Sequence, residues 1–219
     1  MNTTQETLEV YQGQFGQFTI TPEDRRGVKI YRGGLLLAAL SFAVGSGLIL
    51  WQGATSLTLS LLTPLFGLFC LGLAISLITI HIYLIPLHRL LQFCWGIGVI
   101  SAVIIAGNSQ EPLAVTVYHQ PLTLLGMGFM FVALTGIYFK EAFCFNRLET
   151  KLLTPLVPFL LLGHLSGVLP LLVEQILLGS WAGLFMIFAL RKVPQEIPSD
   201  IGDKSVFTYL KQQRSVSVS

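Results

Sequence analysis

Histidine and the charged residues of one segment are the side chains whose types and positions could do chemistry in this 219-residue chain. His164 stands inside an uncharged run that extends from Leu152 to Leu172. An imidazole nitrogen can ligate the metal of a haem or a chlorophyll, and an ionisable side chain inside a membrane span is by default a candidate for function. The alternative is that His164 hydrogen-bonds to a neighbouring helix and serves packing. His164 is therefore a candidate cofactor-binding residue, with chlorophyll or haem as the ligand, or else a structural histidine.

The segment Lys140–Lys151, which reads KEAFCFNRLETK, interleaves charges of both signs with aromatic side chains. Such a segment can lie in the headgroup region, where aromatic rings sink inward and bases meet anionic lipid. Lipid binding alone asks for bases without acids, so the mixed charge favours a protein partner. The residues predicted to bind this partner are Glu141, Phe143, Phe145, Arg147 and Glu149.

Signatures of other chemistry are missing from the sequence. It has no HExxH, GxSxG or Walker motif, and no GxGxxG pattern that follows a strand. Its three cysteines form no metal-binding spacing and no even disulfide set, and its net charge of +2 is too small to suggest nucleic acid. We therefore expect a protein that is not an enzyme and that has no metal site.

The composition indicates the elements that must position these residues. Hydrophobic residues make up 53% of the chain and charged residues only 11%, whereas soluble domains are roughly a quarter charged. The apolar runs are continuous, which is typical of membrane helices and not of the alternating strands of a membrane barrel. The fold class predicted is an all-α, polytopic membrane helical bundle with six transmembrane helices, at residues 33–51, 58–80, 91–107, 121–139, 152–172 and 175–190.

The basic residues predict how this bundle is oriented. In the six-span scheme all 13 Lys and Arg residues lie on one side of the membrane, which is the pattern of cytoplasmic loops. Both termini are therefore expected to be cytoplasmic. The chain divides into an N-terminal cytoplasmic or interfacial segment (residues 1–32), the six-helix domain (33–190) and a mobile cytoplasmic tail (191–219).

Two local patterns refine this organisation. Val10–Thr21 is polar, carries spaced aromatic residues and two glycines, and predicts a short hairpin or extended segment on the membrane surface. Thr21-Pro22-Glu23-Asp24 predicts a helix start, with Thr21 as the cap and Pro22 at the first position. The glycine pairs 163/167 and 179/183 predict close packing between helices, within the chain first and between copies second.

Three stretches carry a family likeness: VYQGQFGQFTITPEDRRGVKIYRGGLLLA, HIYLIPLHRLLQ and KEAFCFNRLETKLLTPLVPFLLLGHLSG. Together they resemble an uncharacterised family of integral membrane proteins from cyanobacteria and plastids, over about residues 10–190. The resemblance implies a photosynthetic organism and a thylakoid or plasma membrane location. It brings no catalytic or binding residues.

These observations leave three functions open. The first is a non-catalytic accessory or assembly factor for a membrane-protein complex in a photosynthetic membrane, contacting its partner through Val10–Thr21 and Lys140–Lys151. The second is a small-solute transporter or channel, and the third is a pigment- or haem-binding protein that uses His164. In each case we expect the protein to contact the lipid bilayer around it, and no nucleic acid is expected as a partner.

Overall fold

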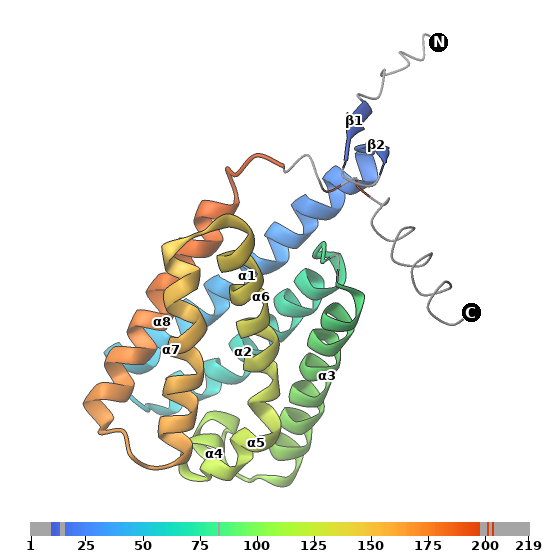
Figure 1. The fold of residues 1–219 in the computed structure, drawn as a ribbon. Coiled ribbons are helices and arrows are strands. Elements are labelled where there is room, and N and C mark those ends of the chain that lie inside the picture. The colour runs from blue at the N-terminus through green and yellow to red at the C-terminus, as the bar shows by residue number, and fades with distance from the viewer. Residues whose placement is uncertain (1–9, 14–15, 83, 198–200, 202, 204–219) are drawn as a thin grey trace.

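A computed structural model describes residues 10–13, 16–82, 84–197, 201 and 203. The chain forms a bundle of helices with a small hairpin beyond one end (Figure 1). The elements are β1 (Val10–Gln12), β2 (Gln17–Thr19), α1 (Pro22–Gln52), α2 (Ser56–Thr79), α3 (Ile85–Asn108), α4 (Leu113–His119), η1 (Pro121–Thr123), α5 (Leu124–Met127), α6 (Phe129–Phe145), α7 (Leu148–Leu165) and α8 (Leu171–Lys192). The predicted all-α class is confirmed.

Five or six membrane crossings are compatible with these helices. Among the described residues, α1, α2, α3, α7 and α8 are each long and apolar enough to cross a bilayer. The candidate for a sixth crossing is a bent pair: residues 121–127 and α6 meet at an angle of 58°. The predicted span at residues 121–139 begins where this pair begins but ends six residues early, because α6 continues to Phe145.

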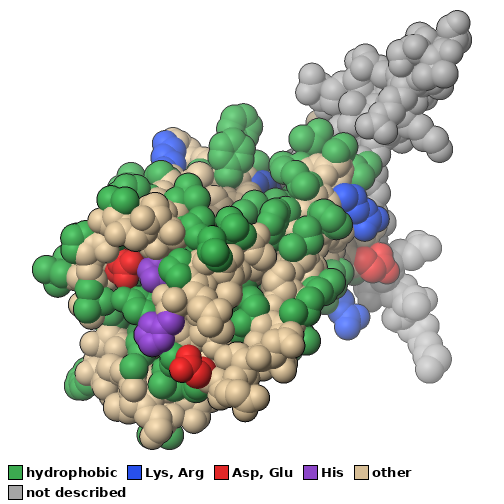
Figure 2. Space-filling view, turned by 90° about the horizontal axis from the view of Figure 1, so that it is seen from below, with side chains coloured by type: hydrophobic (Ala, Val, Ile, Leu, Met, Phe, Trp, Pro, Cys, Tyr) green, Lys and Arg blue, Asp and Glu red, His purple; other side chains and the backbone are tan. Residues whose placement is uncertain are grey.

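The helices run alternately up and down the bundle. α1 begins and α8 ends at the same end of the bundle, which we call the charged end; α4, α5 and the turn between α7 and α8 lie at the opposite end, the α4 end (Figure 1). The two ends differ in their charged side chains. Figure 2 looks onto the α4 end and shows histidine and acidic side chains there, with Lys and Arg side chains only at the margins of the view.

The N-terminal elements form as predicted. β1 and β2 pair antiparallel, and the rings of Tyr11 and Phe18 stack across the pair with centroids 5.7 Å apart. Thr21 then caps α1: its hydroxyl accepts from the Asp24 amide at 3.2 Å, and the Asp24 carboxylate accepts from the Thr21 amide at 3.0 Å. This reciprocal pair satisfies amide groups that a helix start leaves open. With 31 residues, α1 is longer than the roughly 20 needed to cross a bilayer, so its first turns extend past the bundle.

Two glycines that the sequence analysis did not single out make a close contact between α1 and α2. A Cβ atom on Gly72 of α2 would lie 2.6 Å from the Gly34 carbonyl oxygen of α1, and one on Gly34 would lie 2.7 Å from the Gly72 carbonyl oxygen. The predicted pairs differ: Gly167 lies in the turn after α7 with φ +66°, and a Cβ on Gly183 would meet nothing within 4 Å. Of the predicted glycines, Gly179 does face another helix, since a Cβ there would lie 3.5 Å from Leu50 of α1, but spacing alone did not identify the contact between Gly34 and Gly72.

The inner face of α6 forms the middle of the core. Leu134, Ile137, Tyr138 and Glu141 recur at helical spacing and are all fully buried. The Tyr138 hydroxyl accepts a hydrogen bond from the indole of Trp181 in α8 at 3.2 Å. The buried face of α6 is therefore apolar in the middle of the bundle and carries a buried carboxylate near the charged end.

Candidate functional site

Glu141 is the centre of a buried charged group that joins three helices. Its side chain is 0% exposed and accepts hydrogen bonds from Lys192 of α8, from Lys140 at 3.1 Å, and from the Tyr31 hydroxyl of α1 at 3.0 Å. A buried charge is tolerated only when it is paired and hydrogen-bonded, because removing it from water costs several kcal/mol. These contacts supply that pairing, so Glu141 links α1, α6 and α8.

The ammonium group of Lys192 is also held by an aromatic ring. Its Nζ lies 3.9 Å from the ring centroid of Phe145, and Lys140 Nζ lies 5.4 Å from the same centroid. A cation over an aromatic face gains electrostatic energy, and the gain is larger where water is excluded. Phe145 therefore covers the two lysines that pair with Glu141.

Glu149 makes a second ionic contact, in the first turn of α7. It is 4% exposed, it accepts from Arg191 of α8 at 3.0 Å, and it forms an ion pair with Arg147 at 3.5 Å. Arg147 in turn donates to the side chain of Gln195 at 3.1 Å. A carboxylate in the first turn of a helix is also favoured by the helix dipole. Glu149 thereby fixes the start of α7 against the end of α8.

Arg32 ties the chain that follows α8 back to α1. Its guanidinium donates to the carbonyl oxygen of Val193 at 3.2 Å and to that of Glu196 at 3.1 Å. Val193 caps α8 and Glu196 lies beyond the helix, so Arg32 satisfies carbonyl groups just past the end of α8. The first residues of the predicted tail are therefore attached to the bundle. Residues 198–200, 202 and 204–219 of that tail lie outside the described residues.

We call this group the charged cluster; it consists of Tyr31, Arg32, Lys140, Glu141, Arg147, Glu149, Arg191 and Lys192. Its members lie on both sides of the turn between α6 and α7, in which Asn146 adopts a left-handed conformation with φ 50°. The side chains left outside are apolar: Phe143 is 84% exposed and Leu148 is 67% exposed. Phe143, Cys144, Asn146 and Leu148 form what we call the α6–α7 tip.

The predicted partner-binding residues are thus divided between the interior and the surface. Glu141 and Glu149 are not surface residues, because lysines and arginines of the same chain pair with them. The Phe145 ring packs against the ammonium groups of two lysines, and the Arg147 side chain is 14% exposed. Phe143, in contrast, is widely exposed. The predicted loop also shrinks to Asn146 and Arg147, since residues on either side of these two belong to α6 and α7.

Sequence analysis missed the partners of these acids. Tyr31, Arg32, Arg191 and Lys192 are far from Lys140–Lys151 along the chain, and only the fold brings them together. One signal was available: the acids Glu141 and Glu149 sit beside apolar runs, and a carboxylate entering such a run requires a base from another helix.

His164 belongs to a different group, at the α4 end. Its Nδ1 lies 2.7 Å from a carboxylate oxygen of Glu174, whose other oxygen accepts from the Tyr118 hydroxyl at 3.4 Å. The rings of Tyr118 and His164 lie with centroids 5.0 Å apart. Burial, followed by the nearby Glu174 carboxylate, raises the pKa of the Tyr118 hydroxyl, so Tyr118 remains a donor to Glu174. The three side chains connect α4, α7 and α8.

The position of His164 differs from the one predicted. α7 ends at Leu165, so His164 lies in its last turn and not deep within a span. The predicted span of residues 152–172 ran on through what is a turn at 166–170, because that turn is apolar in sequence. His164 Nε2 is covered by protein and has no hydrogen-bond partner among the described residues.

Replacing His164 by alanine is expected to lower the stability of the purified protein by about 1 kcal/mol, the scale measured for hydrogen bonds between membrane helices. The cause is that Glu174 would lose the imidazole. The measurement is thermal unfolding in one detergent, with His119→Ala as the control, because His119 is exposed. Since Nε2 is covered, we also expect the wild-type protein to be colourless. A visible absorbance band that His164→Ala removes would contradict this and establish pigment or haem ligation.

Within the described residues, no group of three His, Cys, Asp or Glu side chains is placed to hold a metal ion. Neither curated proteins nor solved structures match the chain. A family model described as "Uncharacterized integral membrane protein (DUF2301)" matches residues 75–209. This range contains α3 to α8, and with them the α6–α7 tip, His164 and every member of the charged cluster except Tyr31 and Arg32. The chain therefore belongs to the DUF2301 family of integral membrane proteins.

Proposed function

We propose that this multi-pass membrane protein is a non-catalytic accessory or assembly factor that docks a membrane-protein partner through the α6–α7 tip. The observation that carries the proposal is the contrast at this tip. Phe143 and Leu148 are widely exposed, while the two acids beside them, Glu141 and Glu149, are buried and paired within the chain. A tip whose acids are already paired presents mainly apolar side chains to a partner.

Rigidity at the tip supports docking. Glu141 and Glu149 fix the end of α6 and the start of α7 against α8, on either side of the two-residue turn. A surface that is already ordered loses little conformational freedom when it binds. The tip can therefore bind a partner through few contacts, because little of their binding free energy is lost to ordering the surface.

The β1–β2 hairpin is the second part of the proposed docking surface. It stands beyond the charged end (Figure 1), and Val10 at its start is 63% exposed. Exposed strands bind partners by adding a further strand or by packing aromatic side chains. If the tip is not the docking surface, the hairpin is the remaining candidate.

Orientation and location belong to the same proposal. Among the described residues, every Lys and Arg lies at or near the charged end: in the first turns of α1, α3 and α7, in the turn between α6 and α7, or at the ends of α6 and α8. The positive-inside rule then makes the charged end, with both termini, cytoplasmic. The family resemblance supports a cyanobacterial thylakoid or plasma membrane, which would place the partner in a photosynthetic membrane.

Reporter tags test this orientation. Tags fused at either terminus are expected to read cytoplasmic, and a tag inserted at 108–111, between α3 and α4, is expected to read the opposite side. The asymmetry of basic residues is the cause. The measurement is the accessibility or activity of a compartment-specific reporter. Termini that read opposite sides would be incompatible with six crossings.

The double substitution Phe143→Ser/Leu148→Ser is expected to reduce recovery of the partner in co-purification from native membranes. It removes the exposed apolar side chains and leaves the charged cluster intact. The measurement compares co-purified proteins at equal membrane abundance of wild type and variant.

The matched control is Phe93→Ser/Leu90→Ser. These residues have the same types, lie near the same end of the bundle on α3, and are 66% and 54% exposed. If both aromatic positions merely face lipid headgroups, the two double variants will behave alike. Unchanged recovery in the tip variant would exclude the tip and leave the hairpin.

A further inference from the structure

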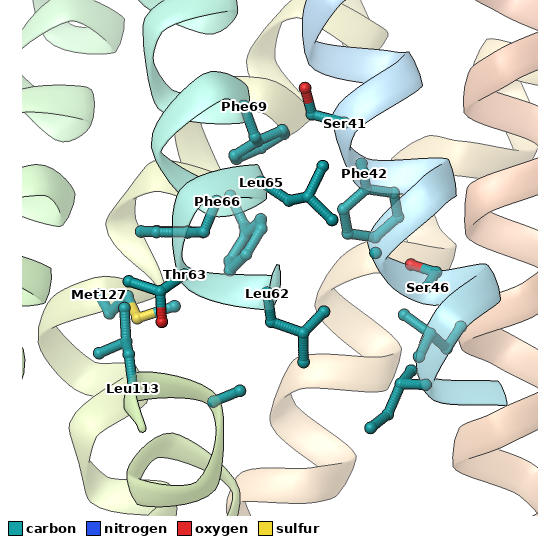
Figure 3. A pocket seen from close by; sticks show the side chains of 15 residues that line it. Ser41, Phe42, Ser46, Leu62, Thr63, Leu65, Phe66, Phe69, Leu113 and Met127 are labelled. Carbon is teal, nitrogen blue, oxygen red and sulfur yellow. The ribbon is translucent and has the colours of Figure 1, made fainter. Parts of the chain in front are cut away.

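An apolar cavity lies inside the half of the bundle nearest the α4 end. It has a volume of about 210 Å³ and is bounded by α1, α2 and α8, with α4, α5 and α6 completing its wall (Figure 3). Phe42, Phe66, Phe69 and Phe131 give it an aromatic lining. For comparison, an engineered apolar cavity of about 150 Å³ stays dry and binds benzene. This cavity is therefore large enough for a hydrocarbon ligand and has little to offer water.

The few polar groups in the lining do not change this character. The hydroxyls come from Ser41, Ser46 and Thr63, and Ser41 already donates to the carbonyl oxygen of Leu37 in its own helix at 2.8 Å. No Lys, Arg, Asp, Glu or His lines the cavity. A water molecule needs two to four polar partners to stay in such a space. The chemistry of the lining thus selects an apolar ligand.

The cavity is also close to the level of the lipid headgroups. Ile49 in its wall is three residues from the end of α1, and Leu62 is six residues from the start of α2, which corresponds to about 5 and 9 Å along the helices. The cavity is partly open, and its lining residue Thr63 is exposed. A chain that begins at the headgroup level can therefore reach the cavity.

Charge at this end favours a neutral headgroup. Among the described residues, the acids and histidines at the α4 end are Glu111, His119, His164 and Glu174, without any Lys or Arg. An anionic headgroup would meet two carboxylates here and no Lys or Arg. The turn between α1 and α2 instead exposes Gln52, Thr55 and Ser56, whose amide and hydroxyl groups can bond to uncharged hydroxyls.

We propose that this cavity binds one hydrocarbon chain of a neutral, hydroxyl-bearing membrane lipid whose headgroup lies against the α1–α2 turn. The site is at the opposite end of the bundle from the α6–α7 tip. Partner recovery by the tip and lipid binding by the cavity are measured separately, so either proposal can fail alone.

The fluorescence of Trp181 can report whether a ligand occupies this cavity. Trp181 is 2% exposed, so bulk lipid does not touch it. Its ring packs against two residues of the cavity wall, with centroids 4.5 Å from Phe42 and 5.2 Å from Phe131. Bromine atoms quench indole emission at short range. A brominated chain in the cavity would therefore quench Trp181, while brominated chains around the bundle would not.

The experiment uses the full-length chain with Trp51→Phe and Trp95→Phe, which leaves Trp181 as the single emitter. It is reconstituted into vesicles of unlabelled neutral lipid that contain a small fraction of a neutral glycolipid with brominated chains. We expect Trp181 emission to fall and to saturate as this fraction rises. The same chains on an anionic headgroup, at the same fraction, are expected to quench clearly less.

Ala114→Leu, which adds a side chain in the cavity wall, is expected to remove most of the quenching. Ala106→Leu is the matched control on an exposed position of α3 near the same end, and it should retain the quenching. If Ala114→Leu does not fold, Thr63→Phe narrows the cavity from α2 instead. Absence of quenching, equal quenching in the filled variant, equal quenching by the anionic lipid, or quenching by water-soluble acrylamide would each overturn the proposal.

Discussion

Replacing Glu141 by leucine is expected to destabilise the protein by about 3–5 kcal/mol, the cost of breaking a buried ion pair by removing one partner. The ammonium group of Lys192 would be left buried and without its carboxylate, and Tyr31 would lose its acceptor. That loss is a large share of the roughly 5–15 kcal/mol by which folded proteins are stable. It can be measured as a shift in thermal unfolding in detergent and as a loss of folded protein from membranes.

Glu111→Leu is the matched control, since Glu111 is an exposed acid at the α4 end of the bundle. We expect little change from it. The double variant Glu141→Leu/Lys192→Met should recover much of the loss, because a buried pair replaced on both sides by apolar side chains is often neutral. If Glu141→Leu unfolds no earlier than Glu111→Leu, the buried pairing is not what holds this end together.

The second large effect is expected from Gly72→Ala, a loss of about 1–3 kcal/mol through overpacking. The added Cβ would lie 2.6 Å from the Gly34 carbonyl oxygen and 2.7 Å from the Ala38 amide nitrogen, and these are backbone atoms that cannot rotate away. α1 and α2 would have to separate. The measurement is again thermal unfolding in a single detergent.

Gly67→Ala makes the identical change in the same helix, where a Cβ meets nothing within 4 Å. Alanine is the better helix former by up to about 1 kcal/mol, so this control should be neutral or stabilising. Gly72→Ala is therefore expected to lower the unfolding temperature, while Gly67→Ala leaves it unchanged or raises it. Shifts of the same sign and size would show that α1 and α2 do not meet at Gly72.

Each span predicted from the sequence overlaps a helix of the structure, but several predicted ends differ from the observed helix ends. Long apolar runs identify spans because hydrocarbon excludes unpaired backbone groups and charges. The same rule placed the end of the fourth span at residue 139, since Lys140 and Glu141 follow. The structure continues α6 to Phe145, with Glu141 paired with Lys192 of α8 and hydrogen-bonded by the Tyr31 hydroxyl of α1. A rule that treats every charge as exposed cannot anticipate a charge that is paired within the bundle.

The candidate site shows the same limit. Spacing within one segment identified Glu141 and Glu149 as unusual, and both are indeed central to the charged cluster. Their roles could not be read from that segment, because the partners Lys192 and Arg191 are supplied by the last helix. Thr21 and Asp24 were predictable for the opposite reason: a capping pair is local in sequence.

The order in which the chain is synthesised gives the Lys192–Glu141 contact a further meaning. The two residues are 51 positions apart, so at about 5–20 residues per second Lys192 is made roughly 3–10 s after Glu141. During that interval α6 carries a carboxylate that has Tyr31 and Lys140 beside it but lacks its second counter-ion, Lys192. The growing bundle therefore stays incomplete until its final helix inserts. A chain that stops before Lys192 would leave Glu141 without the cation that α8 supplies, so the last helix completes the pairing of an acid made much earlier.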